Sequence, residues 1–67
     1  MNKHTVKVNG HDTSVFIEKE FWIELKYISK LNNKSISEIV SDIDKNKVTQ
    51  NLSSAIRLYV LNHLKNK

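Results

Sequence analysis

Cysteine and proline are missing from this 67-residue sequence, and glycine occurs once, as Gly10. Without cysteine the chain can form neither disulfides nor thiolate–zinc sites, which suits a reducing compartment. A single glycine is too few for most glycine-rich phosphate loops and nucleophile-bearing turns. We therefore expect no cofactor, no metal centre and no enzymatic activity.

Long hydrophobic runs are also missing. No stretch approaches the ~20 apolar residues of a membrane span, and the N-terminus lacks the apolar segment of a signal peptide. We expect a cytoplasmic protein without a membrane partner. The chain makes one domain, residues 1–67, and a domain this small buries only ~60% of the surface that it exposes when unfolded. With disulfides and thiolate-bound zinc excluded, association with a second copy is the remaining source of stability.

Negative charge is in short supply. Asp and Glu number 7 against 11 Lys and Arg, and the net charge is +4 with a pI near 9.5. This balance favours an acidic partner such as nucleic acid. The three histidines, His4, His11 and His63, are too scattered for a metal site, and the carboxylates of residues 38–44 have no nucleophile nearby.

A hairpin, residues about 4–17, is the first feature that the sequence does contain, in the stretch TVKVNGHDTSVFI. Asn9-Gly10 is the strongest short-range signal for a type I′ turn, which needs positive φ at both central residues. With this pair as the loop, Val8 faces His11, and successive residues point to opposite faces. The inward face then carries Val6, Val8, Thr13, Val15 and Ile17, and the outward face carries Lys3, Thr5, Lys7, Asp12, Ser14 and Phe16.

Three helices follow the hairpin. Apolar residues recur at helical spacing over residues 19–31, 36–45 and 52–64. Ser35, with Glu38 three residues later, predicts a capping box at the start of the second helix. This order of segments predicts an α+β fold that is mostly helical. Since a lone hairpin is barely stable, we expect two copies to pair their ribbons across a two-fold axis, with the helices packed beneath.

The stretch TSVFIEKEFWIELKYISKLNNKSISEIV, residues 13–40, resembles the ribbon-helix-helix superfamily of Arc/MetJ-type proteins. The likeness lies in a short alternating strand, a carboxylate-rich helix start, an Asn-containing turn and a second helix that begins at serine. More narrowly, GHDTSVFIEKEFWIELK with the later NLSSAIRLYVLNHL is similar to a bacterial subgroup of ribbon-helix-helix domain proteins.

The resemblance implies an intertwined homodimer that binds double-stranded DNA as a transcriptional regulator, such as a repressor. In the superfamily, two strands, one from each subunit, form a ribbon that lies in the major groove. The outward side chains of the ribbon contact base edges, and the N-terminus of the second helix binds a phosphate. The base-facing residues carried over are Asp12, Ser14 and Phe16, with Lys7 added from the extra strand. The phosphate contacts are Lys34, Ser35 and Ile36, with Lys3 added. The dimer core is Val15, Ile17, Trp22, Leu25, Ile28, Ile39 and Ile43.

Two departures from the superfamily pattern leave an alternative open. Asp12 would repel phosphate, and Phe16 offers only an apolar contact, for instance to a thymine methyl. Two hairpins side by side would also form a sheet about 14 Å wide, against a major groove of ~12 Å. Either the first strand leaves the sheet as an arm, or the sheet lies across the groove, or this chain does not read DNA in this way. The alternative is a protein–protein module with the same dimer fold, antitoxin-like or an assembly scaffold, in which Phe16 packs against a partner. Lys26, Lys30 and Lys34 form either a phosphate-facing stripe or the solvated side of the first helix.

Overall fold

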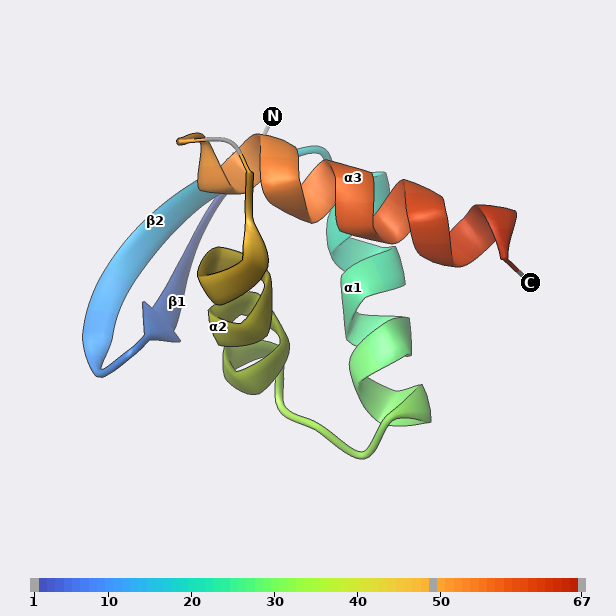
Figure 1. Cartoon of the computed structure of the whole chain (residues 1–67), viewed down its shortest axis with the longest axis horizontal. Helices are drawn as coiled ribbons and strands as arrows, with labels where there is room; N and C mark the ends of the chain where they lie inside the picture. The colour runs from blue at the N-terminus through green and yellow to red at the C-terminus, as the bar shows by residue number, and fades with distance from the viewer. Residues whose placement is uncertain (1, 49, 67) are drawn as a thin grey trace.

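A two-stranded sheet followed by three helices makes up the structure, a computed structural model that describes residues 2–48 and 50–66. The expected fold class is confirmed, and the homodimer remains a prediction. The second and third helices each extend one residue beyond the ranges expected from the sequence. The segments are β1 (Asn2–Val8), β2 (His11–Ile17), α1 (Lys19–Leu31), α2 (Ile36–Asn46) and α3 (Leu52–Lys65) (Figure 1).

The hairpin has the register that the Asn-Gly signal predicts. Asn9 and Gly10 have φ values of 52° and 83°, so both central residues of the turn lie in the left-handed region. Val8 pairs with His11, and the antiparallel pairing continues without interruption to Asn2 and Ile17. A turn of this type matches the right-handed twist of the flanking strands, and it thereby determines which residues face the helices.

The inward face of the hairpin forms one side of the hydrophobic core. Val6, Val8, Val15 and Ile17 are buried there. The ring of His4, on the same side, stacks on Trp22 of α1 with 3.8 Å between ring centroids and 7° between the ring planes. The helices contribute the other side, which consists of Leu25, Ile28, Ile39, Val40, Ile43, Ala55, Ile56 and Val60.

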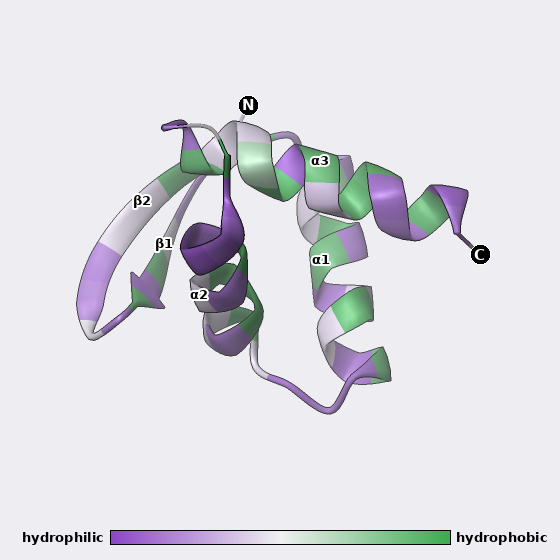
Figure 2. Cartoon of the chain, in the orientation of Figure 1, coloured by the Kyte–Doolittle hydropathy of each residue, from purple (hydrophilic) through white to green (hydrophobic). Residues whose placement is uncertain are grey.

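The helices divide the coverage of the sheet between them. α2 packs along β1, α3 packs along β2, and α1 contacts both α2 and α3. Figure 1 shows α3 lying across the ends of the other segments, with β2 on the outer side of the hairpin. Figure 2 shows the hydrophilic stretch that joins α1 to α2, and apolar residues that recur along α3 between polar ones. Within the described residues, no helix has the length and apolar character that crossing a membrane requires.

The turn between α1 and α2 sets the start of α2. Asn33 adopts a φ of 53°, and the Lys34 N–H donates to the carbonyl of Ser29 at 3.0 Å. Asparagine tolerates this left-handed conformation better than most residues. The chain then enters α2 through the capping box that the sequence predicts at Ser35 and Glu38.

Candidate nucleic-acid interface

The outward face of the hairpin, defined as Lys3, Thr5, Lys7, Asp12, Ser14 and Phe16, is exposed at all six positions. Phe16, a large apolar side chain, keeps 50% of its surface accessible. The pairing places Lys7 opposite Asp12 and Lys3 opposite Phe16. All four residues predicted to face DNA bases therefore share one solvent-facing surface, together with one of the predicted phosphate contacts.

Charge on this outward face is mixed. Lys3 and Lys7 supply two ammonium groups and Asp12 one carboxylate, so the face carries a net charge of +1 (2 − 1) in each chain. Lys7 and Asp12 are cross-strand neighbours, yet no salt bridge joins them among those found in the described residues. The carboxylate reduces the attraction of this surface for phosphate without being neutralised inside the chain.

The N-terminus of α2 offers two backbone N–H groups. Ser35 Oγ accepts from the Glu38 N–H at 3.1 Å, and Glu38 Oε1 accepts from the Ser35 N–H at 2.9 Å. The Lys34 N–H is bonded within the preceding turn. Of the predicted contacts Lys34, Ser35 and Ile36, only Ile36 therefore keeps an N–H without an acceptor in the described part of the chain. The N–H of Ser37 is the second such group, because the first turn of a helix lacks intrahelical acceptors.

The Lys34 side chain is engaged as well. Its Nζ lies 3.2 Å from Asp42 Oδ2, with the two side chains 47% and 56% exposed. An exposed pair of this kind is held by ~1 kcal/mol or less, so a phosphate can compete for the lysine. The other carboxylates of α2 have partners at the two ends of this helix, since Glu38 completes the capping box with Ser35 and Asp44 binds Lys47 at 2.6 Å.

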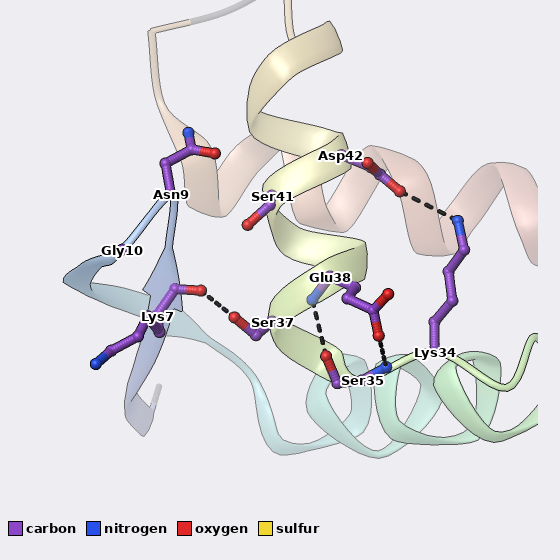
Figure 3. Close-up of a pocket in the computed structure, with 9 residues that line it drawn as sticks. All are labelled: Lys7, Asn9, Gly10, Lys34, Ser35, Ser37, Glu38, Ser41 and Asp42. Atoms are coloured by element: carbon purple, nitrogen blue, oxygen red, sulfur yellow. Dashed lines mark hydrogen bonds and ion pairs between the residues drawn. The ribbon is translucent and has the colours of Figure 1, made fainter.

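A groove of about 470 Å³ separates the hairpin turn from α2. Figure 3 shows Lys7, Asn9 and Gly10 on one side of it and the first turns of α2 on the other. One hydrogen bond crosses it, from Ser37 Oγ to the carbonyl of Lys7, while the Lys7 side chain points away from α2 (Figure 3). Ser37 therefore ties the hairpin to the start of α2. Sequence reasoning missed this residue.

A second set of hydrogen bonds joins α3 to the C-terminal end of β2. The Phe16 N–H donates to Ser53 Oγ at 3.0 Å, and Arg57 Nη2 donates to the Phe16 carbonyl at 3.0 Å. Arg57 Nε also binds Glu18 Oε1 at 2.9 Å, where β2 passes into α1. This hydrogen bond, with a smaller backbone contribution, holds the pKa of Glu18 below its ordinary value of 4.5. Sequence reasoning missed Ser53, Arg57 and Glu18.

A signal for this tie was present in the sequence. Ser53 and Arg57 are four residues apart, so they share one side of a helix whose other positions carry the apolar stripe. Arg57 is also the single arginine of the chain. Nothing in the sequence, however, indicates that their partner is the backbone of a strand 37 to 41 residues earlier.

A family model described as ribbon-helix-helix domain matches residues 1–64. The chain belongs to this family. Ribbon-helix-helix domains are typically DNA-binding transcription regulators, and they typically form dimers. The chain matches no curated protein and no solved structure.

The residues predicted for the dimer core lie in the core of the single chain. Six are buried, namely Val15, Ile17, Leu25, Ile28, Ile39 and Ile43. Trp22 is partly buried and packs against them. Their role between two copies stays a prediction, and Val15, Ile17 and Leu25 have no accessible surface left for a second copy to cover. Among the described residues, no group of three His, Cys, Asp or Glu side chains could hold a metal ion.

Proposed function

We propose that this ribbon-helix-helix protein is a cytoplasmic homodimer that binds double-stranded DNA and regulates transcription, as a repressor does. The outward face of the hairpin would contact the DNA. The observation that carries the proposal is the Ser37–Lys7 hydrogen bond. It holds the hairpin beside the N-terminus of α2, so that the two surfaces with which such domains contact DNA are neighbours.

Each group on these surfaces has a distinct role in the proposal. Ser14 can donate to and accept from base edges, and Phe16 can contact a thymine methyl. The ammonium groups of Lys3 and Lys7 neutralise DNA phosphates on either side of the major groove. The free N–H groups of Ile36 and Ser37 suit a further phosphate, because they lie at the positive end of the helix dipole.

The width of the sheet determines how the hairpin can meet DNA. Every residue of β1 is paired with β2, and the Lys7 carbonyl is bonded to Ser37. These contacts argue against β1 leaving the sheet as a separate arm. A dimer with two such hairpins would carry four strands, about 14 Å across, so it would lie over the groove rather than deep within it. The lysines of β1 would then reach the flanking phosphates.

A selection of bound duplexes from a random DNA pool, repeated at two salt concentrations, tests the proposal. Recovery of a palindromic or tandem motif is the expected result. Lys7→Gln should lower the slope of log affinity against log salt by about 0.9 per lost phosphate contact. Lys45→Gln is the matched control, because Lys45 is exposed in the last turn of α2, away from the hairpin turn. No enriched motif, with equal slopes for both variants, would contradict the proposal.

The second candidate function is a protein–protein module, antitoxin-like or an assembly scaffold. The observation that favours it is a stripe on α1, Ile23, Tyr27 and Leu31, whose side chains are 51%, 47% and 54% exposed. These positions recur every four residues, so they form one apolar strip on the helix surface. Capture of a protein through this strip, with no motif from the DNA pool, would favour the module over the regulator.

A further inference from the structure

The outer edge of β2 is the part of the hairpin where a further strand could pair. In an antiparallel pair, the N–H and C=O of one residue both point to the partner strand and those of the next residue both point away. The backbone N–H and C=O of Phe16 point away from β1, as shown by their hydrogen bonds to Ser53 and Arg57 of α3. By alternation, the backbone groups of Ser14 and Asp12 point to the same outer edge.

α3 occupies one position of this edge and leaves the others open. Both backbone groups of Phe16 are used at 3.0 Å, so they cannot also pair with a strand. For Ser14 and Asp12, the described residues supply no acceptor or donor beyond those of the hairpin itself. Gly10, the next residue with this orientation, lies in the turn and is not extended. The open edge therefore has two residues with four hydrogen-bonding groups.

Few registers are possible for two copies that pair through this edge across a two-fold axis. If the two-fold axis passes through Val15 or Ser14, the backbone groups of Phe16 must pair with the second copy, but α3 already binds them. Pairing centred on Asp12 places two carboxylates directly opposite each other, which is destabilising. Pairing centred on Thr13 uses Asp12 and Ser14 alone and forms four interchain hydrogen bonds.

We propose that α3 sets the register of the dimer ribbon through Ser53 and Arg57, and that this register places the two-fold axis at Thr13. The inference rests on the proposed homodimer, whose strand pairing is the one that the family implies, and adds the register of that pairing. The side chains that this register brings together are compatible with it. Asp12 lies opposite Ser14 of the second copy on the outward face, where the carboxylate can accept a hydrogen bond from the hydroxyl. Thr13 meets its own symmetry mate, and its partly exposed side chain has surface left to bury.

The register has a consequence for recognition. A Ser14 hydroxyl that donates to the carboxylate of the second copy keeps its lone pairs as acceptors. The centre of the ribbon then presents acceptors to DNA, which suits the amino groups of cytosine and adenine in the major groove. The same pairing gives the Asp12 carboxylate a hydrogen-bond donor, which the described residues of the single chain do not supply.

Disulfide cross-linking of introduced cysteines tests the register. Because the chain has no cysteine of its own, every cross-link must come from the introduced residues. Thr13→Cys should give a disulfide-linked dimer in a glutathione redox buffer, since residues opposite each other in a non-hydrogen-bonded pair lie about 4.5 Å apart. A mixture of Asp12→Cys and Ser14→Cys should give the heterodimer. Ser14→Cys alone should remain monomeric on a non-reducing gel, because its symmetry mate lies too far away. The mixture keeps the test informative if Thr13→Cys fails to fold.

Other cross-linking patterns would overturn the proposal. A Ser14→Cys homodimer would place the axis at residue 14, and a heterodimer of Ser14→Cys with Phe16→Cys would place it at Val15. No cross-link in any sample would exclude β2 as the interface. Duplex binding by the unsubstituted protein separates the two ideas. Binding together with another register overturns this inference alone, whereas no binding and no dimer overturns the proposed function too.

The role of α3 is tested in the Ser14→Cys background. Ser53→Ala removes the acceptor of the Phe16 N–H and leaves the Phe16 carbonyl bound to Arg57. One of the two Phe16 groups that the register centred on residue 14 needs is then free, so the Ser14→Cys homodimer should rise at least several-fold. Ser54→Ala is the matched control, because Ser54 is its neighbour in α3 and its hydroxyl makes none of the hydrogen bonds to β2. An equal yield of homodimer in both backgrounds would show that the Ser53 contact of α3 does not set the register.

Discussion

Removing the cap of α2 separates the stability of this protein from its proposed contact with DNA. Ser35→Ala deletes the acceptor of the Glu38 N–H, a bond of 3.1 Å, but leaves the bond of 2.9 Å from the Ser35 N–H to Glu38. The freed N–H lies on an exposed residue and can be hydrated. The free energy of unfolding should therefore fall by about 1 kcal/mol, within the usual range for such caps.

Asn51→Ala is the control, because Asn51 also caps a helix, accepting from the Ser54 N–H at 3.2 Å through its Oδ1 at the start of α3. It should also lower the free energy of unfolding by about 1 kcal/mol. In a domain of this size, that corresponds to a Tm lower by about 4–8 °C. Trp22 is the single tryptophan and stacks on His4, so its fluorescence should report unfolding in urea. Protein concentration must be constant, since a dimer is stabilised by mass action.

DNA binding should distinguish these two variants. Ser35→Ala loosens the first turn of α2, where Ile36 and Ser37 present their N–H groups, so affinity should fall about fivefold on every duplex. That loss is the equivalent of about 1 kcal/mol. Asn51→Ala should leave affinity unchanged, since α3 begins away from this groove. Equal losses for the two variants would mean that reduced stability, and not a phosphate contact, explains the effect, and would refute the reasoning.

Three further predictions concern the hairpin and its junction with α1. Asp12→Asn should raise affinity for all duplexes in a fluorescence anisotropy titration, because it removes a charge that repels phosphate; lower affinity would contradict this. Ser14→Ala should relax sequence preference in the random-pool selection, and equal losses on all sequences would exclude a reading role. The folded-state pKa of Glu18 is lowered, so its contribution to stability is present above its unfolded value of 4.5 and is lost as pH falls through the folded value. Glu18→Gln should remove that part of the acid sensitivity in urea unfolding, and an unchanged pH profile would contradict it.

The sequence by itself determined the features that depend on residues close together along the chain. Asn9-Gly10 sets the hairpin register, because few other residues adopt two consecutive positive φ values. Ser35 and Glu38 set the start of α2, because a capping box needs residues three apart. The alternation and the helical spacing then indicate which face of each segment packs into the core, which is why the predicted core residues are buried or partly buried.

Only the tertiary structure decided which polar groups meet across the fold. The Ser37–Lys7 bond spans 30 residues, and Ser53 and Arg57 reach Phe16 across 37 and 41. Such contacts have no signature in spacing, because they depend on how rigid segments pack once their apolar faces are buried. The same packing pairs Lys34 with Asp42 and brings α3 to the edge of β2. The local pattern therefore makes the ribbon, whereas the third helix determines how much of its edge stays open to a second copy.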